Sequence, residues 1–385
     1  MLFLFISLLT AIVQSHHCIH DTLDIPRGRE TTSHIEYGTP PFKTKLTSPP
    51  FSTSEAVRAL ATTENVAGPR QPIRIRAIYK FTETNALNTK IQDTFMPAAL
   101  CLWSNALRVQ PIKGPIKFDR SCASSWQVEG KPCARFKEGA NTCGAEVTLE
   151  EEWMNALTAC TTQPNVDCTT KKAGSGIANA DYVIIVKAFE TEACKNSPST
   201  MGYAFPCRFD QYDRPILGFI NFCPAAISGT SDASATSTAA HELAHALGFS
   251  GSSFAFMRED DGVTPRTPRG ADGRPVIAAL TCANGQTSTT YRPPASTTLQ
   301  RTTARGNPNV FSIVTPRVKA ATIKHFDCAS AIGAELENQP TGAGCWGSHW
   351  VCFVVIYCSF VCDFGGIFLL MCFSFFFLDS RNNVC

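Results

Sequence analysis

One short segment limits what this chain can fold into more than any other feature. Residues 236–250 read TSTAAHELAHALGFS, and their alanines and leucines suit a buried helix. His241 and His245 are four residues apart, so a helix would bring both imidazole rings to one face, about 6 Å apart along its axis. Two imidazole nitrogens in that arrangement can bind one Zn²⁺ at roughly 2.0–2.1 Å each. Gly248 can end the helix soon afterwards in a left-handed conformation.

Glu242 adds a candidate general base to this helix. It follows the first histidine directly, so its carboxylate reaches the rim of the same site. There it can take a proton from the attacking water and pass it to the leaving amine. The pattern HExxHxxG is therefore typical of zinc-dependent peptide hydrolysis. The alternative is a buried helix whose two histidines are only hydrogen-bonded within the core.

A catalytic zinc site also needs a third protein ligand and one open position. In the short version of the pattern, that ligand stands three residues after the glycine, and here the position holds Gly251. The chain has eight histidines, four of which precede residue 35. The remaining choice is His325, His349 or a carboxylate. His325 falls in a helical run, whereas His349 follows a glycine-rich stretch that can fold back to a metal, so the residues favour His349 and leave the others open.

The start of the chain and its cysteines predict an extracellular protein. Residues 2–13 form an apolar run too short to span a bilayer, followed by a cleavage position after Ser15, which predicts a signal peptide over residues 1–15. The chain has 18 cysteines in 385 residues and no Cys-x-x-Cys pair, which favours disulfides over zinc ribbons. A net charge of +2 argues against nucleic acid as a partner. We therefore expect the protein to be secreted or at the cell surface.

The composition divides the rest of the chain into zones. Residues 16–69 are rich in Pro, Ser and Thr and predict a loosely structured pro-segment. Residues 70–350 predict a globular domain, with a long surface insertion at 258–310. Within that domain, the patterns predict strands at residues 72–81, 180–189 and 217–223 and helices at residues 96–107, 149–159 and 316–338. The predicted strand at residues 217–223 is also a candidate for pairing with an extended substrate.

Several segments together resemble one protein family. HELAHALGFS at residues 241–250, with GAGCWGSHW far downstream at 342–350, resembles the leishmanolysin family of surface metalloproteases. ANADYVIIV at 178–186 looks like the family's strand before the catalytic helix, and GFINFCPAAI at 218–227 looks like the segment that leads into it. HHCIHD at 16–21 resembles the family's pro-peptide motif.

The resemblance extends over roughly residues 16–350 and implies a fold and a set of roles. The fold would be α+β, a disulfide-rich, metzincin-like zinc protease domain with a twisted sheet and an HExxH active-site helix. His241, His245 and His349 would hold Zn²⁺, and Glu242 would be the general base acting on protein or peptide substrates. Cys18 would be a cysteine switch, whose thiolate occupies the open zinc position until the pro-segment is removed. An ordinary disulfide partner is the alternative for Cys18.

The remaining cysteines are even in number. Setting aside Cys18 and the five cysteines near the C-terminal end leaves twelve, enough for six disulfides. These twelve candidates are Cys101, Cys122, Cys133, Cys143, Cys160, Cys168, Cys194, Cys207, Cys223, Cys282, Cys328 and Cys345.

The chain departs from the family pattern after His349. The family has a methionine turn beneath the metal, and here the only later methionine is Met371, inside an apolar tail at residues 351–385. A membrane span starting at Trp350 would pin a zinc ligand at the bilayer surface, so we expect this tail not to be native coding sequence. A membrane or lipid-anchor signal and a packed core segment are the alternatives. We therefore expect an incomplete catalytic unit, and a disulfide-rich adhesion or binding protein is the competing function.

Overall fold

The computed structural model describes the chain between residue 32 and residue 371, with gaps. The described ranges are 32–37, 70–139, 141–144, 147–281, 287–304, 307–337, 346–350, 360–364 and 367–371. Helices and sheets both contribute, so the expected α+β class is confirmed. The predicted signal peptide and most of the predicted pro-segment lie outside these ranges.

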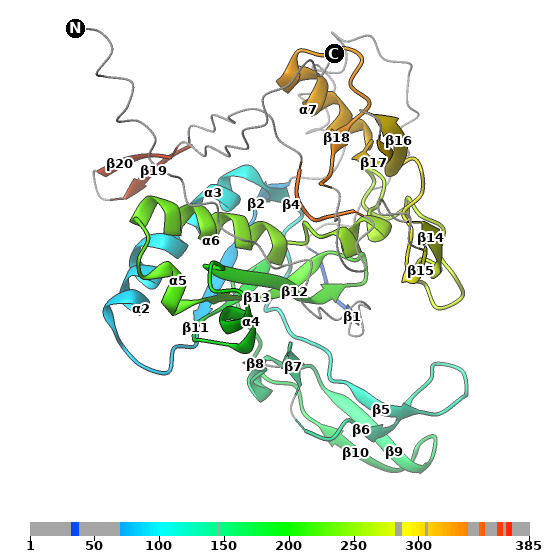
Figure 1. Cartoon of the computed structure of the whole chain (residues 1–385). Coiled ribbons are helices and arrows are strands. Elements are labelled where there is room, and N and C mark those ends of the chain that lie inside the picture. Colours follow the sequence, from blue (N-terminus) through cyan, green and yellow to red (C-terminus); the bar gives the residue numbers. More distant parts are fainter. Residues whose placement is uncertain are drawn as a thin grey trace, which may run out of the picture.

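The centre of the molecule is a five-stranded sheet (Figure 1). Its strands lie in the order β1 (Thr32–Ser33), β12 (Gly202–Asp210), β13 (Pro215–Phe222), β11 (Tyr182–Ala188) and β3 (Ile75–Tyr79). β3, β11 and β13 run parallel, and β12 runs antiparallel to β13. The expectation that β13 pairs with a substrate is wrong, because β12 and β11 occupy both of its edges.

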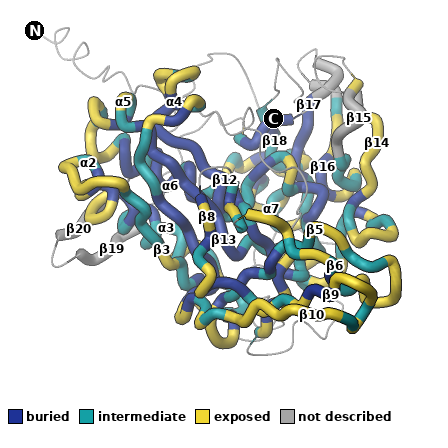
Figure 2. The backbone as a smooth tube through the Cα atoms, turned by 90° about the horizontal axis from the view of Figure 1, so that it is seen from below, coloured by how far each residue is buried: buried dark blue, intermediate teal, exposed yellow. Residues whose placement is uncertain are grey.

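The uninterrupted apolar sequence of β11 follows from burial on both faces of this sheet. Tyr182, Ile184 and Val186 pack into one core, whereas Val183 and Ile185 pack into the core on the opposite face. All five side chains are fully buried. Side chains alternate along a strand, so a strand covered on both sides needs apolar residues at every position. Figure 2 shows buried backbone in dark blue at the centre of the molecule, around β12 and β13.

Helices cover one face of the sheet. A helical run consists of α2 (Ala86–Lys90), a π-helical turn (Ile91–Phe95) and α3 (Met96–Ala106), and α3 packs beside α6 (Asp232–Ala246). The helix predicted at 96–107 is confirmed, and the run starts earlier because Asn85 caps α2 by accepting a hydrogen bond from the N–H of Asn88. Trp103 ties the two helices together, since its Nε1 donates to the carbonyl of Ala240 at 2.9 Å.

Several short elements complete this part of the molecule. They are the paired strands β2 (Gln71–Pro72) and β4 (Arg108–Val109), the paired strands β7 (Thr142–Cys143) and β8 (Val147–Thr148), and the helices α4 (Glu192–Asn196) and α5 (Pro224–Ile227).

A second sheet extends away from the first (Figure 1). It consists of β10 (Val166–Lys171), β9 (Leu157–Gln163), β6 (Cys133–Phe136) and β5 (Cys122–Ser125), in that order. The helix predicted at 149–159 is wrong, because the segment makes only a 3₁₀ turn at Glu151–Trp153 and then enters β9. The threonine-rich sequences of β9 and β10 favour strands. Asn165 turns the chain between them with a φ of 68°, and the Cys160–Cys168 disulfide links the two strands of this hairpin.

The region after α6 holds more regular structure than its composition predicts. The predicted surface insertion contains the hairpin of β14 (Ala278–Thr281) and β15 (Thr287–Tyr291). It also contains β16 (Leu299–Ala304) and the start of β17 (Asn307–Ile313), and β17 pairs in turn with β18 (Ala334–Glu335). Leu299 of β16 packs with Phe254, Leu336 and Trp346 in a third core, so the insertion is not confined to the surface.

The helix predicted at 316–338 is correct only in its first half. α7 (Pro316–Phe326) ends at Asp327, which takes a left-handed conformation with a φ of 49°. Beyond it the chain approaches β17 closely, since a Cβ on Gly333 would lie 2.2 Å from the carbonyl oxygen of Ile313. The chain therefore continues as β18 and not as helix.

A few residues of the predicted pro-segment are built into the domain. Thr32 and Ser33 form β1 against the end of β12, and Ile35 is buried in the core. The side-chain amide of Gln211 bonds both the N–H and the carbonyl of Ile35, at 2.9 and 2.8 Å. Tyr37 donates a hydrogen bond to Asp210. The boundary between pro-segment and domain stays a prediction.

Disulfides account for most of the cysteines named above. The structure pairs Cys122 with Cys133, Cys143 with Cys207, Cys160 with Cys168 and Cys194 with Cys223. Cys101 and Cys328 are disulfide-bonded as well, and Cys282 and Cys345 lie outside the described residues. The Cys143–Cys207 bond closes a separation of 64 residues, for which the chain-entropy estimate is about 4 kcal/mol of stabilisation.

Part of the apolar tail is described as a hairpin. β19 (Phe360–Phe364) pairs antiparallel with β20 (Ile367–Met371). Among the helices of the described ranges, none combines the length and the apolar character that crossing a membrane would require. The expected origin of the tail stays a prediction.

Candidate metal centre

α6 begins and ends at residues whose chemistry suits those positions. Ser231 caps the helix by accepting a hydrogen bond from the N–H of Ser234, and Asp232 places a negative charge in the first turn. At the other end, Gly248 has a φ of +106°, and a Cβ there would lie 2.9 Å from Cγ of Pro215. Glycine is therefore needed for both its backbone conformation and its small size.

The sheet fixes the C-terminal end of α6. Tyr182 in β11 donates a hydrogen bond to the carbonyl of Ala246 at 2.6 Å. The tyrosine side chain lies directly against Gly218 of β13, and a Cβ on Gly218 would be only 1.9 Å from the tyrosine oxygen. Burial raises the pKa of Tyr182 well above its ordinary value, so the hydroxyl keeps the proton that this bond requires. The helix that carries His241 and His245 is thus held at a defined position on the sheet.

Three histidine side chains converge beside this helix. Nε2 of His245 lies 3.2 Å from Nε2 of His241 and 3.2 Å from Nε2 of His349. The three ligand atoms all lie within 4.8 Å of one another. Nitrogens bound tetrahedrally to one zinc at roughly 2.0–2.1 Å stand about 3.3 Å apart. The observed spacing therefore fits one shared metal ion.

The partners of the other ring nitrogens set the direction of two of these rings. Nδ1 of His245 lies 2.8 Å from the carbonyl oxygen of Phe249, and Nδ1 of His349 contacts the carboxylate of Glu337. Both partners only accept, so each Nδ1 donates to its partner, and in the neutral imidazole Nε2 then has a lone pair that can bind a metal. Three neutral imidazoles form a donor set that suits Zn²⁺.

His349 reaches the centre from a segment 104 residues beyond His245. Gly251, which stands where the short pattern has its third histidine, holds that segment on both sides. The N–H of Gly251 donates to Oγ of Ser348 at 2.8 Å, and its carbonyl accepts from Nε1 of Trp346 at 3.1 Å. The residue that replaces the expected ligand therefore anchors the distant one.

Glu242 is fully buried next to the histidines. It leaves α6 toward the start of β12, where a Cβ on Gly202 would lie 3.6 Å from Cγ of Glu242. A carboxylate held in this way is shielded from bulk water on the side of the sheet, which strengthens its interactions with groups at the centre.

The structure thus brings together three of the five predicted site residues, and a fourth, Glu242, lies on the helix that carries two of them. His241 and His245 come from α6, and His349 joins them. His325, the alternative third ligand, is exposed on α7 and is not part of the cluster. Cys18 lies outside the described residues, so the switch stays a prediction.

Three residues that support the site were not predicted from the sequence. Phe249 and Gly251 stand in the turn after the helix, where their position beside Gly248 was the available signal. Glu337 belongs to no sequence motif. Only the tertiary structure shows that this residue, just after β18, contacts His349.

Comparisons with known proteins agree with this geometry. The model of the leishmanolysin peptidase family matches residues 152–354, a range that contains α6 and His349. A leishmanolysin-like peptidase of Caenorhabditis elegans is 34% identical over 299 residues, which cover 72% of this chain. This chain belongs to the leishmanolysin family.

Other relatives share the leishmanolysin similarity at different levels. A leishmanolysin-like peptidase of Drosophila melanogaster is 37% identical over 297 residues, 73% of this chain. A ciliated left-right organizer metallopeptidase of Mus musculus is 29% identical over 180 residues, 46% of this chain. The matched regions cover 43%, 42% and 22% of the worm, fly and mouse proteins, so the chain spans less than half the length of these relatives.

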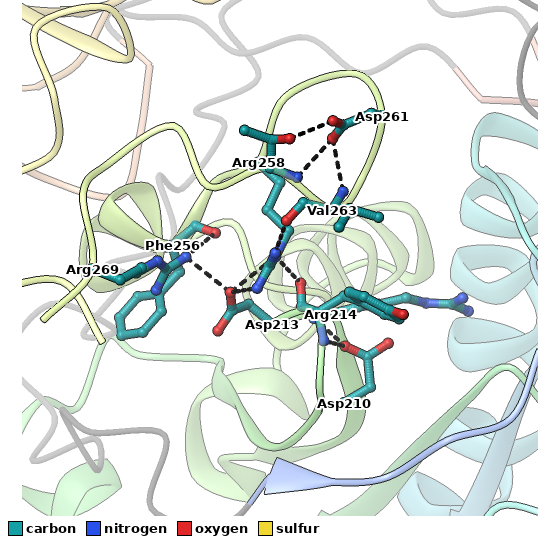
Figure 3. Close-up of polar contacts among 10 residues, drawn as sticks. Asp210, Asp213, Arg214, Phe256, Arg258, Asp261, Val263 and Arg269 are labelled. Carbon is teal, nitrogen blue, oxygen red and sulfur yellow. Dashed lines mark hydrogen bonds and ion pairs between the residues drawn. The ribbon is translucent and has the colours of Figure 1, made fainter. Parts of the chain in front are cut away.

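In this leishmanolysin-family chain, a polar cluster ties the segment after α6 to the turn between β12 and β13 (Figure 3). Asp213 accepts from Arg258 at 2.7 Å and from Arg269 at 2.9 Å. A cavity of about 350 Å³ adjoins the cluster and is lined by Arg258 and Gly248 among others. None of the three converging histidines lines this cavity, so it is separate from the candidate metal centre.

Proposed function

We propose that this chain is a zinc-dependent endopeptidase that hydrolyses proteins, is secreted or lies at the cell surface, and is made as a zymogen. Its family is one of metallopeptidases. The observation that carries the proposal is the convergence of His241, His245 and His349, two of which share α6 with the buried Glu242. The three imidazoles would hold Zn²⁺, which when bound lowers the pKa of water and polarises a carbonyl group.

Glu242 carries the proton in this proposal. Its carboxylate takes a proton from the water that attacks the scissile carbonyl, and it then gives that proton to the leaving amine. Burial of Glu242 keeps this transfer away from bulk water. His245 and His349 keep their protons on Nδ1, so they do not compete with Glu242 as acids at the reacting face.

The zymogen and the location are further parts of the proposal. The disulfides of the described residues support an oxidising compartment, in line with a signal peptide at residues 1–15. The thiolate of Cys18 would take the open zinc position and exclude the water that hydrolysis needs. A Cys18→Ser variant that is as latent as the parent protein would argue against this switch.

The test of the enzymatic proposal is zinc content and peptide hydrolysis of the purified full chain beside Glu242→Ala. We expect both proteins to bind about one zinc and the variant to lose about 10²- to 10⁴-fold in activity. Glu335→Gln, in β18, is a matched control that removes a carboxylate outside the cluster. If the parent protein binds no zinc and is no more active than the variant, the enzyme proposal fails. The adhesion or binding protein, suggested by the missing methionine turn, would then be the better account.

A further inference from the structure

We propose that Glu337 is the positioning residue of the third zinc ligand. Its carboxylate contacts Nδ1 of His349. In this position it holds the proton on Nδ1 and turns Nε2 toward the other two histidines. The proposal rests on the proposed zinc site and assigns the residue that makes one of its ligands competent.

The main chain of Glu337 is fixed on both sides. Its N–H donates to the carbonyl of His349 at 3.0 Å, and its own carbonyl accepts from the N–H of Gly347 at 2.9 Å. The preceding residue, Leu336, is fully buried and forms an antiparallel bridge with Trp350. Glu337 and His349 therefore lie side by side on two paired segments, and the contact between their side chains follows from that register.

Gly347 leaves the space that the Glu337 side chain needs. A Cβ at position 347 would lie 2.3 Å from Cγ and 2.4 Å from Oε1 of Glu337. Any other residue would push the carboxylate away from its present place. A close approach on a glycine, together with main-chain bonds on both sides, indicates that the contact with His349 is built into the fold.

The chemistry explains why His349 needs such a partner. A carboxylate bonded to Nδ1–H fixes the tautomer and the ring orientation and makes Nε2 a stronger donor to a metal. For His245, the carbonyl of Phe249, four residues later, fixes the ring orientation in the same way. His349 lies outside regular helix or strand, so a side chain from the neighbouring segment has to set the direction of its ring.

The experiment measures zinc affinity of the full chain by competition with a chelator, for Glu337→Ala, Glu337→Gln and the control Glu335→Gln. We expect Glu337→Ala to weaken zinc binding roughly 10- to 100-fold. Glu337→Gln keeps an acceptor for Nδ1–H and should lose clearly less, whereas Glu335→Gln should bind as the parent protein does. The visible spectrum of the Co²⁺-loaded chain should change in Glu337→Ala, because the geometry at His349 is altered.

Each outcome decides the proposal. Parental zinc affinity and an unchanged Co²⁺ spectrum in Glu337→Ala would overturn it, and so would equal losses in all three variants, since these would show a general effect of charge or folding. If Glu337→Ala does not fold, Glu337→Gln decides the question. A small but measurable loss of zinc affinity relative to the Glu335→Gln control supports the role of Glu337, and no loss contradicts it. If the parent chain binds no zinc, the proposed function fails, an outcome distinct from a zinc-binding parent with unaffected variants.

Discussion

The two halves of the candidate metal centre are built in different ways. α6 supplies His241, Glu242 and His245 from one span of five residues, so helical geometry alone sets their spacing. His349 comes from residues 346–350, which form no helix, and contacts with Gly251 and Glu337 set its place. One half is ordered by local hydrogen bonds and the other by contacts between distant parts of the chain.

This difference predicts where the site is most easily lost. α6 is packed into the core along its length and is tied to the sheet through Tyr182. The segment of His349 depends on bonds that join Gly251 to Ser348 and Trp346, across 97 and 95 residues. Because residues 346–350 form no helix of their own and are placed by contacts with distant parts of the chain, a change in one of these contacts should affect metal binding more than a change of similar size around α6.

The largest effect should come from removing one ligand from each half. We expect His245→Ala and His349→Ala each to lower zinc affinity by roughly 10³-fold or more, because each removes a metal bond. His325→Ala, an exposed histidine of α7, is the matched control and should leave zinc affinity unchanged. Parental zinc affinity in His349→Ala would mean that α6 forms the site with some other group, and the comparison between the two halves would no longer hold.

A smaller effect should come from Gly347→Ala, which leaves every ligand in place. The new Cβ would displace the Glu337 side chain, so zinc affinity should fall by roughly 10- to 100-fold, as for loss of Glu337 itself. The double variant Glu337→Ala with Gly347→Ala should be no weaker than Glu337→Ala alone, since both changes break the same contact. Additive losses in this double-mutant cycle would show that Gly347 acts independently of Glu337.

The same division separates what the sequence could predict from what it could not. The HExxH helix, its glycine end and the buried strand β11 depend on neighbouring residues, and all appear as expected. The segment at 149–159 looked helical by its apolar spacing, but a disulfide and threonine-rich pairing made it enter β9. His349 could be favoured from the sequence, whereas Glu337 could not, because only the pairing of Leu336 with Trp350 brings it to that histidine.

The smallest effect concerns an ion pair of the central sheet that takes no part in the metal centre. Asp181 accepts from Nε and Nη2 of Arg74 at 2.8 and 2.9 Å, and from the N–H of Ile112 at 2.7 Å. Burial by itself raises the pKa of Asp181, but the bonds from Arg74 and Ile112 outweigh burial and hold the pKa below its ordinary value.

This lowered pKa makes a pH prediction for the metal-free protein. A carboxyl group whose pKa is lower in the folded state stabilises the fold above its unfolded pKa of about 4, and the gain is lost as pH falls through the folded value. The free energy of unfolding should therefore decrease below about pH 4, and Asp181→Asn should be less stable at pH 7 with a shallower acid dependence. Urea unfolding in the presence of a chelator, at a series of pH values, measures both. An identical acid slope in the two proteins would contradict the role given to Asp181.

The central claim is that His349 joins the two histidines of α6 on one metal ion. The most direct measurement is anomalous X-ray diffraction at the zinc edge from crystals of the zinc-loaded full chain. We predict one strong peak at roughly 2.0–2.1 Å from Nε2 of His241, His245 and His349. A zinc peak coordinated by His241 and His245 without His349, or no peak between these side chains in a protein that binds zinc, would contradict the account.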